Sequence, residues 1–122
     1  MTTKTSDTNP SDGNPNLSPS EIFSLLSNER RRYALYYLTT QVGAIHLGEL
    51  AEQLAIWEGE PTMDHYHRIY VGLLHNHLSA LIRADVVEYD ADEELISISD
   101  GIRPVRPYLE LSESEDMSHL DW

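Results

Sequence analysis

Residues 64–90 read DHYHRIYVGLLHNHLSALIRADVVEYD, and this stretch decides the fold. At 100° per residue, seven of its apolar or aromatic side chains and one histidine fall on one face of a helix. That face comprises Tyr66, Tyr70, Leu73, Leu74, His77, Leu78, Leu81 and Ala84. The run Val86–Asp90 follows directly and contains residues that favour strands. The stretch therefore predicts a long helix over 64–84 that leads into a β-strand.

A second strand is predicted just downstream. Val87 and Tyr89 alternate with acidic residues, and Ile96 and Ile98 alternate with serines after a short polar loop. Alternation with a period of two on both sides of a short loop is typical of a β-hairpin.

The first predicted helix begins at a capping box. Ser18 can cap the helix while Glu21, three residues later, reaches back to it, and Pro19 occupies the first helical position. Ile22, Leu25 and Leu26 then repeat at helical spacing.

Two more helices and a short strand are predicted between this helix and residue 64. Asn28 can cap a helix over residues 29–40, and a third helix covers residues 48–58. Residues 42–46 are too few for a helix and are expected to be extended. Pro61 biases the residue before it away from the helical region and predicts a turn.

The order helix, helix, short strand, helix, helix and hairpin is that of a winged helix-turn-helix. This is an α+β fold, mostly helical, with a C-terminal two-stranded β-hairpin as its wing. We expect this domain to occupy residues 17–100. Residues 1–16 are almost entirely polar and are expected to be a disordered arm. Residues 101–122 are expected to form an acidic tail that either keeps the protein in solution or docks on a protein partner.

Short passages of the chain also resemble a family of small haloarchaeal winged-helix proteins of unassigned function. They are LSNERRR at 26–32, ELA at 49–51 and HLSALIRADVVEYD at 77–90. More distantly, the passage from His77 to Val87 is similar to the recognition-helix-to-wing passage of ArsR-like repressors, HLxxLxxAGLV. Asp85 stands where that pattern has Gly. The resemblance covers about residues 18–99 and implies a winged-helix fold and transcriptional regulation.

The charge balance points to a particular environment. The chain has 21 Asp and Glu against 8 Lys and Arg, a formal net charge of −13, and Lys4 is its one lysine. This composition is typical of proteins from salt-saturated cytoplasms, where a Debye length of about 3 Å at ~1 M salt screens self-repulsion. An ordinary acidic protein is the alternative. No membrane span or signal peptide is evident, so we expect a cytoplasmic protein.

Several chemistries are not expected. The chain has no cysteine, which excludes thiolate metal sites and cysteine nucleophiles. The pairs His65/His67 and His75/His77 are two residues apart, so on a helix their rings point away from each other and cannot share a metal ion. We find no nucleophile motif and no phosphate-binding glycine loop. No catalytic, cofactor or metal site is therefore predicted.

The candidate function rests on a segment of the chain that lacks acidic residues. Residues 65–84 contain no Asp or Glu, although the chain as a whole is strongly acidic. The outer face of this helix offers Arg68, Gly72, His75, Ser79 and Arg83 to double-stranded DNA. Arg30, Arg31 and Arg32 open another helix at the end that disfavours cations, so they either pair with carboxylates or contact DNA phosphates.

The predicted wing favours a different function. Its tip carries Asp90, Asp92, Glu93 and Glu94, which would repel DNA even where salt screens them. The alternative to a DNA-binding regulator is therefore a winged-helix protein–protein interaction module that does not bind DNA.

A homodimer is also predicted. The first helix, together with Tyr33, Tyr36 and Tyr37, offers more apolar surface than so small a domain is expected to bury in its own core.

The charge interpretation yields a direct test. We expect the melting temperature to rise between about 0.1 and 3 M KCl, because screening of the net charge favours the compact state. Thermal unfolding followed by circular dichroism measures this. A melting temperature that stays flat across this range would favour an ordinary acidic protein.

Overall fold

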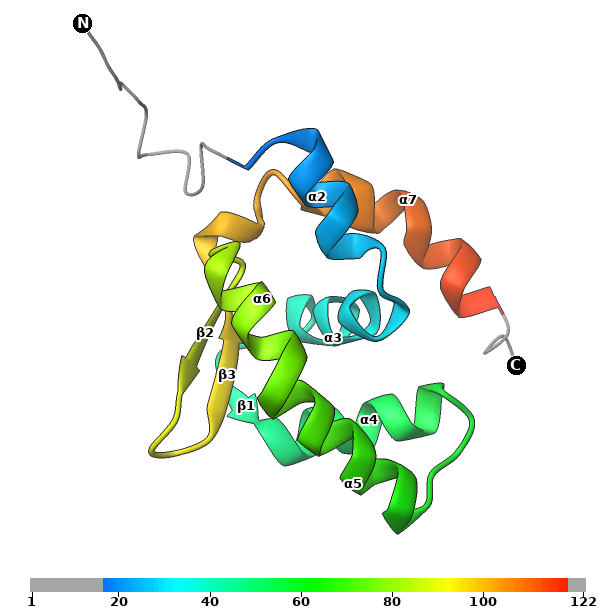
Figure 1. Cartoon of the computed structure of the whole chain (residues 1–122). Coiled ribbons are helices and arrows are strands. Elements are labelled where there is room, and N and C mark those ends of the chain that lie inside the picture. Colours follow the sequence, from blue (N-terminus) through cyan, green and yellow to red (C-terminus); the bar gives the residue numbers. More distant parts are fainter. Residues whose placement is uncertain (1–16, 119–122) are drawn as a thin grey trace, which may run out of the picture.

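The computed structural model describes residues 17–118 and shows the predicted α+β winged helix-turn-helix (Figure 1). Its elements, in chain order, are α2 (Pro19–Leu26), α3 (Glu29–Thr39), β1 (Ile45–His46), α4 (Leu47–Trp57), α5 (Met63–Gly72), a π-helical turn η2 (Leu73–His77), α6 (Leu78–Arg83), β2 (Val87–Asp90), β3 (Leu95–Ile98), a 3₁₀ turn η3 (Asp100–Ile102) and α7 (Arg106–Met117). No helix among these is long and apolar enough to cross a bilayer.

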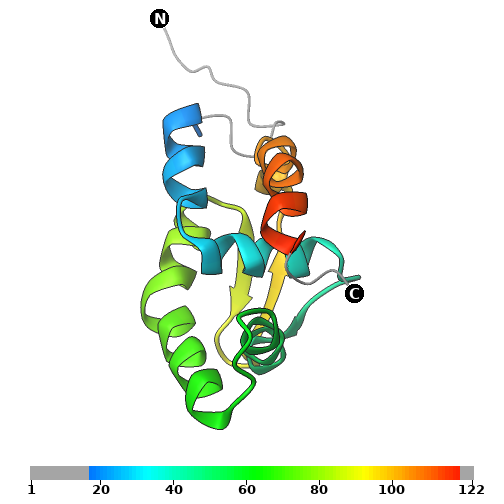
Figure 2. The ribbon, with the colours of Figure 1, turned by 90° about the vertical axis from the view of Figure 1, so that its right-hand side faces the viewer.

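The predicted hairpin and short extended segment form one small antiparallel sheet in the order β1-β3-β2. Ile96 pairs with Tyr89 on one side and with Ile45 on the other, and its side chain is fully buried. The elements α5, η2 and α6 are continuous and together form the predicted long helix. Figure 2 shows this long helix on one flank of the molecule and α7 on the other, with the sheet between them.

Helix α3 lies at the centre of the fold. It packs against α2, α4, α7 and β3, so nearly every side of it is covered. Its capping residue is Asn28, whose side chain accepts a hydrogen bond from the backbone N–H of Arg31. The capping box of Ser18 and Glu21 at the start of α2 is likewise present, as predicted.

Two of the three tyrosines of α3 are not available for a second copy of the chain. Tyr33 and Tyr36 are each only 2% exposed, and the ring of Trp57 packs edge-on against Tyr33 at 5.9 Å. Part of the surface on which we based the homodimer is therefore buried within the chain, whereas Tyr37 is half-buried and Phe23 of the first helix is 57% exposed. Helix α7, which the sequence did not predict, covers Tyr36 and so reduces the apolar surface left for a second copy.

The expectation that the chain beyond residue 100 is only a tail is wrong as far as Ser118. Val105 and Leu109 are buried, and α7 packs on α3. The next positions on this face are polar: Ser112 Oγ lies 2.6 Å from Tyr36 Oη, and Asp116 accepts hydrogen bonds from that hydroxyl and from Arg32. The apolar stripe of α7 is too short to predict a packed helix from the sequence, because after Leu109 the contacts of this face with α3 are polar. Residues 119–122 lie outside the described part of the chain.

The long helix contains a π turn because of the spacing of its buried residues. Ile69, Leu73, His77 and Leu81 are all buried and follow one another at intervals of four. In an α-helix each such step overshoots a full turn by about 40°, which adds up to about 120° over three steps. The extra residue of a π turn cancels about 100° of this drift.

Two positions of the predicted apolar face differ for the same reason. Ile69 was absent from that face but is fully buried, whereas Leu74 was included but is 39% exposed. A uniform 100° per residue cannot place either side chain correctly on a helix that changes pitch.

The turn between α6 and β2 keeps a left-handed residue although it lacks the glycine of the ArsR-like pattern. Asp85 has φ 62°, a conformation that short polar side chains tolerate. Its carbonyl accepts a hydrogen bond from Ser99 Oγ at 2.5 Å. A Cβ at Gly101 would lie 1.9 Å from the same carbonyl oxygen, so this close approach requires glycine.

The packing of α7 leads to a test. Leu109→Ala should lower the free energy of unfolding by about 2–5 kcal/mol, because it leaves a cavity against α3. Glu113→Ala, at an exposed position of the same helix, should change it by no more than about 0.5 kcal/mol. Denaturant unfolding in high KCl measures both. Equal effects of the two substitutions would mean that α7 does not contribute to the core.

Candidate nucleic-acid interface

The turn between α4 and α5 is sharply defined. Gly59 has φ 80° just after α4, and the N–H of Glu60 donates to the carbonyl of Ala55 at 3.0 Å, as in a Schellman motif. Thr62 then caps α5 by accepting a hydrogen bond from the N–H of His65 at 3.1 Å. These contacts set the angle between the two helices of the helix-turn-helix.

The outer face of the long helix is exposed and free of acidic residues from residue 65 onward. Arg68 is 63% exposed, and the other exposed side chains are His67, Val71, Leu74, His75, Asn76, Ser79, Ile82 and Arg83. Arg68 lies 3.7 Å from Glu60, which is also exposed, so this ion pair is weak. His75, Ser79 and Arg83 follow at intervals of four and form one ridge.

Gly72 faces a different neighbour from the one expected. A Cβ at this position would lie 3.6 Å from Arg30 Nη1, so its open side is turned toward α3. The absence of a side chain at Gly72 is therefore accounted for by α3, without an approaching sugar-phosphate backbone.

Arg30 belongs to an ion-pair cluster behind the helix-turn-helix. Its Nε and Nη2 donate to the two oxygens of Glu58 at 2.8 Å each, and His65 Nε2 donates to Glu58 Oε1 at 2.8 Å. Burial alone would raise the pKa of Glu58, but the hydrogen bonds from Arg30 and His65 outweigh it and lower the pKa. The side chain of His65 is only 13% exposed, so this histidine does not belong to the outer face of the long helix.

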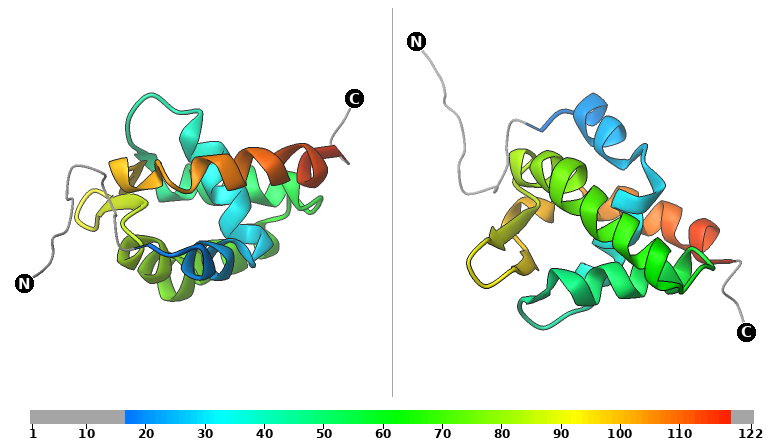
Figure 3. Two further views of the ribbon diagram at one scale, coloured as in Figure 1. Left: turned by 90° about the horizontal axis from the view of Figure 1, so that it is seen from above. Right: turned by 60° about the horizontal axis from the view of Figure 1, so that its bottom comes forward.

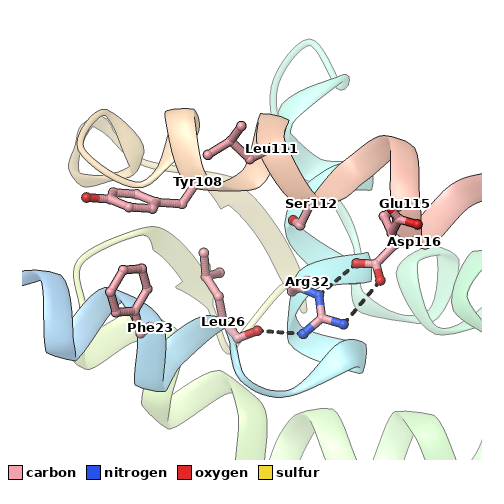
Figure 4. Close-up of a pocket in the computed structure, with 8 residues that line it drawn as sticks. All are labelled: Phe23, Leu26, Arg32, Tyr108, Leu111, Ser112, Glu115 and Asp116. Carbon is pink, nitrogen blue, oxygen red and sulfur yellow. Dashed lines mark hydrogen bonds and ion pairs between the residues drawn. The ribbon is translucent and has the colours of Figure 1, made fainter.

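Arg32 is bound on the side of α3 that faces α7, away from the cluster around Glu58. It donates to both oxygens of Asp116 at 2.7 and 3.2 Å and to the carbonyl of Leu26 at 2.6 Å (Figure 4). For Arg30 and Arg32, the structure therefore provides the carboxylate partners that we considered as the alternative to DNA phosphates. The half-buried Arg31 instead lies in a groove between α2 and α6, beside Arg83.

The wing is fastened to the long helix. Tyr70 of α5 donates a hydrogen bond to Glu94 at the hairpin tip, and this bond, followed by burial, raises the pKa of Tyr70 to about 12. Asp90 accepts from the backbone N–H groups of Asp92 and Glu93 and so shapes the loop. Two of the four tip carboxylates thus have structural roles, while the side chains of Asp92 and Glu93 are exposed.

A second surface feature lies between α2 and α7. Phe23 and Tyr108 meet edge-to-face at 5.3 Å, and with Leu26 and Leu111 they line an open, mostly apolar cavity of about 470 Å³ (Figure 4). Across residues 17–118, no three His, Asp or Glu side chains gather in a way that could hold a metal ion.

Fold and surface together define a winged helix-turn-helix protein whose long helix presents an exposed face without carboxylates. Residues 23–97 match the family described as a domain of unknown function (DUF7344), and the chain belongs to that family. Neither the search of curated proteins nor that of solved structures gave a match to the chain.

The cluster around Glu58 gives a pH-dependent prediction. Glu58→Gln should lower the free energy of unfolding by about 1.5–3 kcal/mol near neutral pH, because it breaks hydrogen bonds to a charged group. The pKa of Glu58 is lowered in the folded state, so its contribution is present above the ordinary value of 4.5 and is lost as the pH falls through the folded value. The difference from the wild type should shrink on acidification.

Denaturant unfolding at several pH values measures this difference. The exposed Glu52→Gln in α4 is the matched control and should have little effect at any pH. A Glu58→Gln defect that is the same at about pH 3 and pH 7 would contradict the ionic role of the cluster.

Proposed function

We propose that this protein is a DNA-binding transcriptional regulator of a high-salt cytoplasm and that it reads the major groove with residues 64–84. One observation carries the proposal: in a chain with a net charge of −13, the exposed face of this helix has no Asp or Glu from residue 65 to residue 84. A winged helix-turn-helix presents its second helix to the major groove, and phosphate contacts require that such a face not be acidic.

The position of each side chain along the helix suggests its role. Recognition helices usually place their N-terminal turns against base edges, while later turns leave the groove. Arg68, near the start, is the candidate for base contacts, and Arg83, about 22 Å farther along the axis, is a candidate for phosphate contact. His75 and Ser79 lie between them, and the exposed Val71 could contact a thymine methyl group.

The neighbouring carboxylates limit the contact area. The ion pair of Arg68 with Glu60 is solvent-exposed, so releasing it for DNA costs at most about 1 kcal/mol. The wing tip holds Asp92 and Glu93 in solvent, and we infer that it stays away from the phosphates.

A homodimer remains part of the proposal, because helix-turn-helix regulators commonly bind paired half-sites as dimers. With Tyr33 and Tyr36 buried, the apolar surface for a second copy is the α2–α7 face with the exposed Phe23 and Leu111. Around Phe23, α2 presents Ser20, Ser24 and Ser27, whereas α7 adds the exposed Glu115 to the same face, so we expect two such acidic copies to associate there only where salt screens their charge.

The protein-interaction module is the second candidate, and a specific observation favours it. Val71, Leu74 and Ile82, on the outward side of the long helix, are each about two-fifths exposed. A helix face that mixes these side chains with arginine and histidine also suits a protein partner, and the acidic wing would not hinder such contact.

A binding panel separates the two functions. Genomic DNA is first selected by the wild type at about 2 M KCl, and affinities are then measured on selected and scrambled duplexes. Arg68→Ala should weaken binding to the selected DNA by about 1–3 kcal/mol and relax preference at one position. Arg83→Ala should weaken binding to all sequences alike. The exposed Arg106→Ala, in α7, is the matched control and should have no effect.

The wing is tested in the same panel. Asp92→Lys combined with Glu93→Lys should raise affinity for every sequence without sharpening preference; Glu94 is left intact because Tyr70 binds it. A dimer predicts selected sequences with two half-sites about one helical turn apart. If the wild type selects no sequence and neither arginine substitution changes binding, the protein-interaction function replaces this proposal.

A further inference from the structure

The groove between α2 and α6 brings together two arginines that are far apart in the sequence. Figure 3 shows α2 close to the C-terminal end of the long helix. Between α2 and α6, Arg31 and Arg83 line a cavity of about 270 Å³ together with Ser24. Arg83 ends the ridge of His75 and Ser79, so the groove adjoins the exposed face of the long helix.

Arg31 differs from the arginines on either side of it. Arg30 and Arg32 each make bidentate hydrogen bonds to a carboxylate, whereas Arg31 Nε is buried and has no hydrogen-bond acceptor within the described residues. Leaving a buried donor without a partner costs about 1–3 kcal/mol, and more for a charged group. The Nε–H of Arg31 therefore calls for an acceptor that residues 17–118 do not supply.

The carboxylate nearest to this groove is already engaged. Glu21 also lines the cavity, but its Oε1 accepts a hydrogen bond from the backbone N–H of Ser18 at 2.7 Å in the capping box of α2. Shifting Glu21 onto Arg31 would break this reciprocal hydrogen bond of the capping box.

The electrostatic surroundings of Arg31 also favour an anion. His77, which is buried in the π turn, has its pKa lowered by burial and then by the positive charges of Arg31 and Arg30. Glu58, the ion-pair partner of Arg30, acts on His77 in the opposite direction and offsets part of the effect of Arg30, whereas Arg31 has no such carboxylate partner within residues 17–118. The protein as a whole is strongly acidic, but this groove is lined by two arginines and by one carboxylate, Glu21, that is hydrogen-bonded to Ser18.

We propose that Arg31 and Arg83 bind a phosphate group in the α2–α6 groove. Guanidinium groups present planar forks of donors that match the oxygens of a phosphate, and Ser24 adds a hydroxyl donor. Since the ridge from His75 to Arg83 leads into the groove, the phosphate is one of the DNA backbone next to the bases contacted by the long helix. In this form the inference rests on the proposed function.

The first arm of the test uses inorganic phosphate and the full chain. Because Arg31 Nε–H is shielded from water, it should give a distinct side-chain resonance in ¹H–¹⁵N spectra. At constant ionic strength, near 1 M KCl, added phosphate should shift this resonance saturably. Arg83→Gln should weaken phosphate binding about tenfold, and Arg31→Lys, which keeps the charge but loses the fork, should also weaken it. Arg106→Gln is the matched control and should leave binding unchanged.

The second arm uses selected duplex DNA. Arg31→Gln and Arg83→Gln should each reduce the slope of log affinity against log salt by about one, equally for selected and scrambled sequences. If no variant changes the slope and phosphate shifts no resonance, the phosphate site is wrong.

The two arms also separate this inference from the proposed function. If the wild type selects DNA but the arginine variants keep its salt slope, the groove is not a backbone contact, while the DNA-binding function stands. If DNA is not bound but phosphate still saturates the site, the proposed function fails, and the groove is a site for a free phosphate-bearing ligand.

Discussion

Three consecutive arginines at the first turn of α3 connect the central helix to two distant parts of the chain. Cations at a helix N-terminus oppose the helix dipole, so their placement needs a compensating interaction. Arg30 obtains it from Glu58 at the end of α4, and Arg32 obtains it from Asp116 in α7. The same two ion pairs hold the helix-turn-helix and the C-terminal helix against α3. The orientation of the long helix and the cover over Tyr36 both depend on them.

The pairing of Arg30 and Arg32 with carboxylates determines which arginines remain to give the surface positive charge. The chain has only eight Lys and Arg, and two of the arginines are neutralised inside the fold. Arg31, Arg68 and Arg83 have no close bidentate carboxylate within residues 17–118, and all three lie on or next to the outer side of the long helix. The net charge of −13 therefore says little about this face, because binding depends on the local distribution of charge.

Features set by neighbouring residues could be predicted from the sequence, and features set by distant partners could not. The caps at Ser18 and Asn28 and the wing hairpin involve residues a few positions apart, and all three are present. The exposure of Arg68, which precedes the π turn, likewise follows from helical periodicity. Helix α7 was missed because its inner face becomes polar after Leu109. Ser112 and Asp116 face inward only because they form hydrogen bonds with Tyr36 and Arg32 of α3, which are distant in the sequence. The carboxylates of Arg30 and Arg32 could not be assigned for the same reason.

The π turn links the packing of the core to the position of Arg83. On an uninterrupted α-helix, Arg83 would lie only about 40° around the axis from the buried Ile69, at the edge of the packed face. The inserted residue rotates α6 by about 100°, so that Leu81 follows Ile69 into the core and Arg83 moves to the solvent side, about 140° from Ile69. The spacing of four that buries Leu73, His77 and Leu81 therefore also places Arg83 in the groove beside Arg31. One constraint, the burial of apolar residues along the long helix, determines both the core contact and the positive end of the candidate interface.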